Sequence, residues 1–272
     1  MSASRNHFMH FDFRSRNMPG PLFAALLLAA WLSPPVLAQT VDELVARNIA
    51  ARGGDAAWRA VDSLRYTGQM ELGQGMLVPY VLEQKRPGKM CIEYVFDAET
   101  AIQCYDGKSG WKVAPFAGRT APVPLSNAEQ RAIAGLTDLY GPLFDYAARG
   151  HRVALLGKEQ VEGRDAWKLK VTLPGGNVRW VYLDAETGLE VKLEAVRNIA
   201  GREQRIETFY RDWVNTEGLL IPHRQESRSA GSGALHPFIV DEVQVNPPID
   251  DARFAMPVND PGRYAHRGES PS

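Results

Sequence analysis

Short runs in which apolar and polar residues alternate follow one another from Leu64 to near the end of the chain. In Trp167–Leu173, every second residue is apolar. Such a period-two pattern is typical of a β-strand with one buried face. Turn residues separate the runs, as in Asp184–Gly188 and Asn215–Gly218. The spacing predicts about ten or eleven strands in one antiparallel sheet, strongly curved or barrel-like, with helices on one face.

Helices are predicted at only a few places in the chain. Thr40–Glu43 has the pattern of a capping box that opens a helix, and Ser126–Glu129 repeats this pattern before a helix that runs toward Leu136. A Gly-Pro pair precedes a further predicted helix, Leu143–Arg149. The Pro-rich stretch Pro115–Pro124 is expected to be irregular.

The N-terminal segment has the layout of a secretory signal peptide. Arg14 and Arg16 precede the uncharged run Leu22–Leu32, and small residues lead to Ala38. The sequence therefore predicts cleavage after Ala38 and export from the cytoplasm. A short N-terminal membrane anchor is the alternative, although the run is short for a bilayer span of about 20 residues.

The charge balance restricts the class of partner. The whole chain has a net charge of −1, and residues 1–38 carry three Arg and one Asp, so the remainder has a net charge of −3. Nucleic-acid binders need a basic excess, and none is expected here. With 44% hydrophobic and 23% charged residues, the composition is that of a globular protein and excludes a fully disordered, collagen-like or coiled-coil chain.

The two cysteines lie on neighbouring extended runs. Cys91 belongs to Lys89–Phe96 and Cys104 to Ala101–Tyr105. If the two runs pair so that the numbers of facing residues sum to 195, Cys91 and Cys104 lie directly opposite each other. If the numbers of facing residues sum to 197, the two cysteines are diagonal neighbours. Both registers allow a Cys91–Cys104 disulfide, which the exported location favours, and two unpaired buried thiols are the alternative.

No standard catalytic or metal-binding motif is present. The chain has no P-loop, no G-x-S-x-G, no C-x-x-C and no H-E-x-x-H. The histidines after residue 38 lack ligand spacing; they are His151, His223, His236 and His266. We therefore expect no enzymatic activity, no metal site and no cofactor.

Apolar and aromatic residues are the remaining candidates for function. On the concave face of a curved sheet, beneath apolar helices, they could line a cavity of lipid or acyl-chain size, whereas the simpler interpretation is an ordinary filled core. The candidate cavity residues are Tyr66, Met70, Tyr80, Met90, Ile92, Tyr94, Trp111, Phe116, Leu136, Leu143 and Phe144.

Several segments in order resemble those of outer-membrane lipoprotein-sorting proteins of the LolA-like superfamily. The resemblance spans roughly Val41–Pro257. The matching segments are Ala51–Gly54, Tyr105–Phe116, Gly141–Tyr146, Gly150–Val153, Gly157–Gly163, Tyr182–Leu189 and Gly218–His223.

This resemblance implies a mainly β (α+β) fold: an incomplete antiparallel β-barrel, or strongly curved sheet of about 11 strands, with helices covering the concave face. It implies one LolA-like lipid-binding domain at residues 39–258, between the signal peptide 1–38 and a flexible tail 259–272. It also implies a monomeric periplasmic protein that carries lipid or lipoprotein acyl chains between the inner and outer membranes. An inner-membrane transporter and an outer-membrane acceptor are then the expected protein partners.

Two other functions remain open at this stage. The same fold could serve as an envelope sensor or a protein-interaction module without any transport role. An enzyme would require a set of polar groups that converge inside the cavity, and the sequence does not suggest one. The cysteine pair is a departure from the family pattern.

Overall fold

The computed structural model describes residues 39–199 and 202–257. The predicted signal peptide 1–38 with its cleavage site, and the predicted tail 259–272, lie outside the described residues. Within the described ranges, no helix has both the length and the apolar character needed to cross a membrane.

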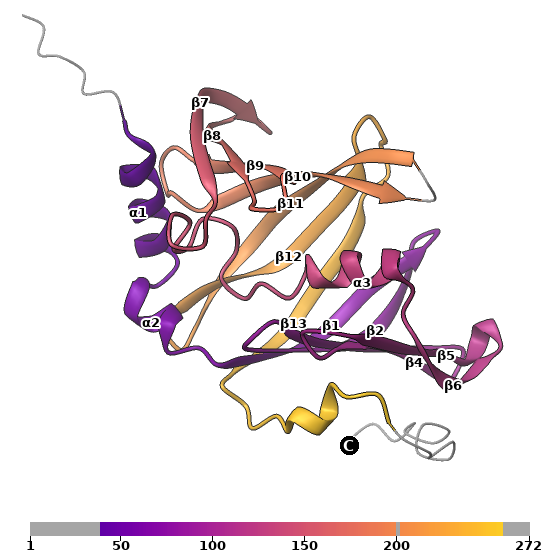
Figure 1. Cartoon of the computed structure of the whole chain (residues 1–272). Coiled ribbons are helices and arrows are strands. Elements are labelled where there is room, and N and C mark those ends of the chain that lie inside the picture. Colours follow the sequence, from indigo (N-terminus) through magenta and orange to yellow (C-terminus); the bar gives the residue numbers. More distant parts are fainter. Residues whose placement is uncertain (1–38, 200–201, 258–272) are drawn as a thin grey trace, which may run out of the picture. The chain divides into compact units, whose positions relative to one another are not determined.

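One antiparallel sheet forms the body of the domain (Figure 1). Its strands run in the order β6-β5-β4-β3-β2-β1-β13-β12-β11-β10-β9-β8-β7, and the described edge strands β6 and β7 do not pair with each other. The sheet curves around a hollow without closing, which confirms the predicted incomplete barrel. The strands are β1 (Ser63–Gly73), β2 (Met76–Lys85), β3 (Lys89–Phe96), β4 (Glu99–Tyr105), β5 (Gly110–Ala114), β6 (Arg119–Pro124), β7 (Arg152–Val161), β8 (Arg164–Thr172), β9 (Val178–Asp184), β10 (Glu190–Ile199), β11 (Arg202–Thr216), β12 (Leu219–Ser229) and β13 (His236–Val245).

The sheet has 13 strands, whereas about 11 were predicted from the spacing of the turns. One difference is β6, which forms within the stretch that was expected to be irregular. It is an edge strand that pairs only with β5, so its two prolines leave few hydrogen bonds unmade.

Within residues 39–199 and 202–257, three α-helices accompany the sheet. They are α1 (Val41–Ala51), α2 (Asp55–Arg59) and α3 (Asn127–Ala134), and both predicted capping boxes are present, at Thr40 and at Ser126. Short 3-10 turns form η1 (Pro115–Ala117) and η2 (Asp251–Arg253). Figure 1 shows α3 lying in the hollow of the curved sheet, with α1 and α2 at one end of it.

The helix predicted at Leu143–Arg149 is wrong, because the segment forms a series of turns. Asp145 has a φ of 48°, which is incompatible with a continuous right-handed helix. Its carboxylate accepts two hydrogen bonds of 2.7 Å from the guanidinium of Arg59, and this contact holds the segment against α2.

Strand register separates the side chains into two faces. Tyr66 pairs with Leu82, and Leu82 pairs with Ile92, so these three residues share the face that is turned toward α1 and α3, here called the concave face. The opposite face is called the outer face. Leu169 and Val181, on the concave face of β8 and β9, pack against α1.

The outer face of β2–β5 is covered by the C-terminal strap, defined as residues 246–256. Phe254 is fully buried there, and its carbonyl oxygen accepts a hydrogen bond of 2.9 Å from the indole N–H of Trp111. Arg253 pairs with Glu83 at 2.6 Å and with Glu93 at 2.7 Å. The strap therefore closes one face of the sheet with both apolar and ionic contacts.

Cys91 and Cys104 lie beneath this strap and are joined in a disulfide bond. They are directly opposite each other on β3 and β4, which is the register whose paired numbers sum to 195, with their Cα atoms 4.0 Å apart. The disulfide thus cross-links neighbouring strands on the outer face.

Candidate ligand-binding face

The helix α3 packs loosely over the concave face of the sheet. Of its eight residues, only Ile133 is buried. Ile133 meets Leu125 and Met90 in a small cluster, with Leu82 and Ile92 packed against it. A helix held by so little apolar contact costs little to displace, because apolar burial is what normally fixes a helix to a sheet.

Polar contacts hold the two ends of α3 instead. At the C-terminal end, the Gln84 amide donates to the carbonyl of Leu136 at 2.8 Å, and Arg179 donates to the carbonyl of Gly135 at 3.1 Å. Near the N-terminal end, Lys112 pairs with Glu129. Hydrogen bonds from Lys112 and Ser126 lower the pKa of Glu129 to about 2. Two strands on opposite sides of the hollow, β2 and β9, therefore both bind the C-terminal end of α3.

Beneath α3, the concave face of β1–β4 is apolar and partly accessible. Four apolar or aromatic side chains on this face are only half-buried: Tyr66, Met70, Ile92 and Tyr94. A strand face that met only water would not need such side chains. Aromatic and Met side chains adapt to irregular apolar ligands.

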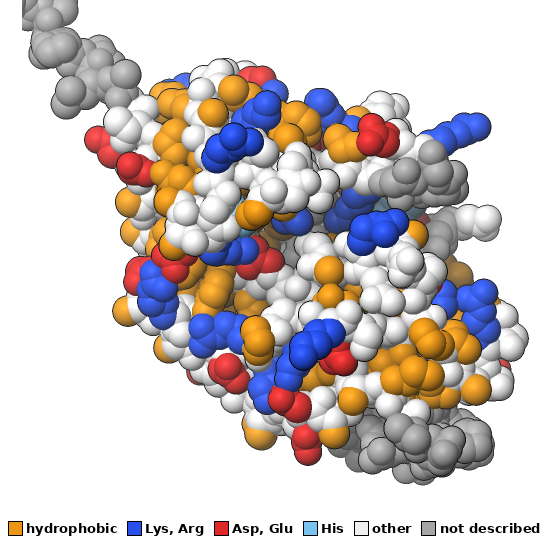
Figure 2. Space-filling model, viewed as in Figure 1, with side chains coloured by type: hydrophobic (Ala, Val, Ile, Leu, Met, Phe, Trp, Pro, Cys, Tyr) orange, Lys and Arg blue, Asp and Glu red, His pale blue; other side chains and the backbone are white. Residues whose placement is uncertain are grey.

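Two tyrosines on the concave face are desolvated without being fully buried. Burial raises the pKa of Tyr66 above its ordinary value and that of Tyr210 to about 12. Both residues nevertheless keep accessible surface and are only half-buried. Figure 2 shows a hollow near the middle of the view, with Lys and Arg side chains around it.

The predicted cavity residues do not all meet at this face. Tyr66, Met70, Tyr80, Met90, Ile92 and Tyr94 lie on it. Tyr80 and Met90 are already buried there, Tyr80 against Phe238 with ring centroids 4.0 Å apart.

The other predicted cavity residues lie elsewhere. Phe116 is exposed in η1 and contacts Tyr94 at the rim, with ring centroids 6.1 Å apart. Leu136 is also exposed, and its carbonyl accepts a hydrogen bond from Gln84 of the sheet. Leu143 and Phe144 are buried in the core, which they help to fill.

Trp111 lies on the outer face rather than in the hollow. It pairs with Cys104, which pairs with Cys91, so all three residues point toward the strap. Strand pairing decides the face of each residue, and residue type cannot reveal it.

A polar group of side chains occupies the concave face of the other half of the sheet, and the sequence analysis missed it. Arg52, at the end of α1, lies 3.6 Å from Glu190 of β10 and donates to the carbonyl of Tyr140 at 2.8 Å. Burial raises the pKa of the Tyr210 hydroxyl, and the charges of Glu190, Arg179, Arg52 and Arg197 also act on it. The alternation of side chains along β9 could have revealed part of this group. Arg179 is two residues from the apolar Val181 on this strand, so the two side chains share a face.

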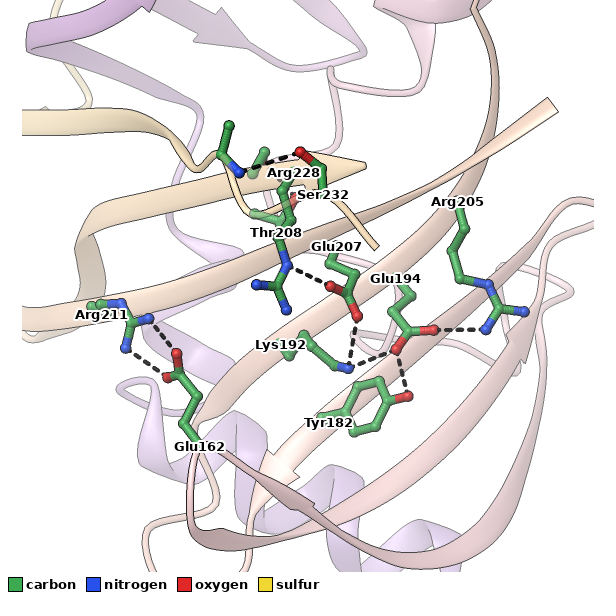
Figure 3. A network of polar contacts seen from close by, with 12 residues as sticks. Glu162, Tyr182, Lys192, Glu194, Arg205, Glu207, Thr208, Arg211, Arg228 and Ser232 are labelled. Atoms are coloured by element: carbon green, nitrogen blue, oxygen red, sulfur yellow. Dashed lines mark hydrogen bonds and ion pairs between the residues drawn. The ribbon is translucent and has the colours of Figure 1, made fainter. Parts of the chain in front are cut away.

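The outer face of the same strands differs in character (Figure 3). There Glu194 accepts from Tyr182 at 2.7 Å, pairs with Lys192 at 2.7 Å and with Arg205 at 3.2 Å. Next to them, Arg228 pairs with Glu207 at 2.7 Å. On this face, each of these three basic groups lies within ion-pair distance of a carboxylate.

A second recess of about 550 Å³ lies beside the strap. It is lined by Ser63, Lys85, Asn246 and neighbouring residues, and none of the predicted cavity residues borders it. Lys85 is engaged there with the Ile249 carbonyl at 2.7 Å and with Asp251 at 2.9 Å. The described ranges contain no group of three or more His, Cys, Asp or Glu side chains placed to hold a metal ion.

Sequence comparisons give no relatives. No protein-family model matches the chain, and a search of curated proteins finds no match.

Solved structures match the chain over most of its length. A DUF1329 family protein from Desulfovibrio piger has a TM-score of 0.58 at 14% identity, over 80% of this chain and 98% of its own. A LolA superfamily protein from Nitrosomonas europaea has a TM-score of 0.53 at 15% identity, over 80% and 98%. An outer membrane lipoprotein-sorting protein domain from Vibrio parahaemolyticus, named as putative, has a TM-score of 0.53 at 14% identity, over 79% and 97%. The chain therefore has the LolA-like fold that the resemblance of its sequence segments predicted.

Proposed function

We propose that this protein binds lipid or lipoprotein acyl chains on its concave face and carries them through the periplasm between the inner and outer membranes. One observation carries the proposal: accessible apolar side chains on β1–β4 lie under a helix that buries only one of its own residues. Apolar burial contributes about 0.8 kcal/mol for each CH₂ group, so a long chain can displace α3 at a net gain. The LolA-like fold and the signal-peptide pattern support the periplasmic location.

Two adjacent residues of β2 offer a matched test. Leu82 and Val81 are both half-buried apolar residues, but Leu82 lies on the concave face and Val81 on the outer face. A carboxylate at Leu82 would oppose an acyl chain in the hollow, whereas the same change at Val81 would not. Thermal unfolding of both variants controls for loss of the fold.

Native mass spectrometry of protein exported to the periplasm measures the outcome. We expect wild type and Val81→Asp to retain or take up phospholipid or fatty acid, and Leu82→Asp to lose it. If folded wild-type protein repeatedly shows no co-purified or exchangeable lipid, the carrier function is wrong. A stable complex with one inner-membrane protein, unaffected by delipidation, would instead indicate a sensor or interaction module.

A further inference from the structure

Two arginines on the concave face lack the ion pairs that arginines have on the outer face. Arg179 lies on β9 and pairs in register with Ala195, and Arg197 is two residues further along β10, so both share the concave face. Among the described residues, neither has a carboxylate within ion-pair distance. The nearby Glu190 is taken by Arg52 at 3.6 Å.

Strand register places the two arginines as diagonal neighbours, because Arg197 is two residues beyond Ala195, the partner of Arg179. Burial, together with the positive charge of Arg179, lowers the pKa of Arg197. Arg179 donates to the carbonyl of Gly135, and no other hydrogen bond of its guanidinium is found among the described residues. Arg179 is half-buried and Arg197 is exposed, and an anion between two such neighbouring positive charges would reduce their repulsion.

The side chains around these arginines are also suited to an anion. Gln204 pairs with Arg197 across the strands, and on β11 and β12 the concave face continues with Thr208 and Ser227, whose hydroxyls are 2.9 Å apart. Tyr210 pairs with Gln225 and lies on the same face. Hydroxyl, amide and guanidinium donors are the groups that hold phosphate and carboxylate oxygens.

We propose that Arg179 and Arg197 form a subsite for the anionic head group, a phosphate or carboxylate, of an amphiphilic ligand whose chain lies along β1–β4. This inference rests on the proposed function and adds the class of ligand. The apolar side chains on β1–β4 are thus accompanied, on β9–β12, by basic and hydroxyl side chains that lie beside apolar ones such as Val181. A ligand that fits both halves has an acyl chain at one end and a negative charge at the other.

The test compares ligands that share one chain but differ in head group. Decyl phosphate, decanoate and decanol are titrated into the folded protein, and inorganic phosphate is titrated alone. Arg197→Gln removes the charge at the subsite. Arg205→Gln is the control, because Arg205 lies on the outer face of β11 and pairs with Glu194.

We expect wild type to bind at least one anionic ligand about tenfold more tightly than decanol. Arg197→Gln should abolish this preference and leave decanol binding unchanged, and Arg205→Gln should keep the preference. If wild type binds all three chains equally, or if Arg197→Gln keeps the preference, the head-group subsite is wrong and the carrier function stands. If inorganic phosphate alone binds as tightly as decyl phosphate, the site serves a free anion and the amphiphile inference fails. If no chain binds at all, both proposals fail.

Discussion

The side-chain amide of Gln84 donates a hydrogen bond of 2.8 Å to the carbonyl oxygen of Leu136, and so ties the end of α3 to β2. Gln84 is buried, while the Leu136 side chain is exposed. The bond thus joins the sheet to a segment that contributes almost no apolar packing of its own. It is a contact that must break if α3 moves away from the concave face.

Loss of this bond should speed ligand exchange. In Gln84→Leu, the carbonyl of Leu136 loses this donor, so the closed position of α3 loses about 1 kcal/mol, or roughly fivefold in population. Stopped-flow release of a fluorescent fatty acid measures the rate. Gln103→Leu is the control, since Gln103 lies on the same face without a hydrogen bond to α3 in the described structure. Equal release rates for both variants would mean that Gln84 does not hold the lid.

The pH dependence of stability should carry a contribution from Glu129. Its pKa in the folded protein is about 2, below the ordinary value of 4.5, so its contribution is complete above pH 4.5 and is lost as the pH falls toward 2. Glu129→Gln imitates the protonated form. The stability difference between wild type and Glu129→Gln, measured by urea unfolding, should therefore be constant at neutral pH and shrink between pH 4.5 and 2.

Glu99→Gln, at the exposed start of β4, is the control for the loss of one carboxylate. A difference between wild type and Glu129→Gln that stays unchanged down to pH 2 would contradict the ion pair with Lys112.

The disulfide should stabilise the domain mainly through the unfolded chain. It links residues separated by 13 positions, and closing a loop of this size is worth about 3 kcal/mol. The double variant Cys91→Ala/Cys104→Ala should lose about this amount in urea unfolding, and its transition should not respond to reductant. Free thiols in the native oxidised wild type would contradict the bond.

The C-terminal strap should contribute strongly to stability through one side chain. Phe254 is fully buried against Trp111 and the disulfide, so Phe254→Ala should lower the free energy of unfolding by about 3–5 kcal/mol. Phe116→Ala, at an exposed phenylalanine, should cost about 1 kcal/mol or less. Similar small losses in both variants would show that the strap is not part of the folded core.

Local patterns predicted much of the fold. The capping boxes at Thr40 and Ser126 fixed the starts of two helices, because each satisfies backbone donors within four residues. Alternation located most strands, but the hairpin pattern left two registers open for Cys91 and Cys104, and the structure shows the directly opposed one. The helix at Leu143–Arg149 failed because a contact with distant Arg59 holds Asp145 at positive φ, and no local pattern encodes that contact.

The candidate site was predicted only in part, for a related reason. Residue type suggested that Trp111 faces a cavity, but its partner strand places it beneath the strap. Conversely, Arg179 and Arg197 look like ordinary solvent-facing strand residues until the register puts them on the concave face, where Arg179 reaches the C-cap of α3. Which face a strand buries depends on pairing between segments far apart in sequence.

The central claim, that an acyl chain lies on the concave face beneath α3, is tested most directly by photo-cross-linking. A fatty acid with a diazirine near its chain end is bound, irradiated and mapped by peptide mass spectrometry. We predict labels at concave-face positions of β1–β3, such as Met70, Ile92 and Tyr94, with competition by unlabelled fatty acid. Labels confined to the outer face or the strap, or labelling that unlabelled fatty acid does not reduce, would contradict the account.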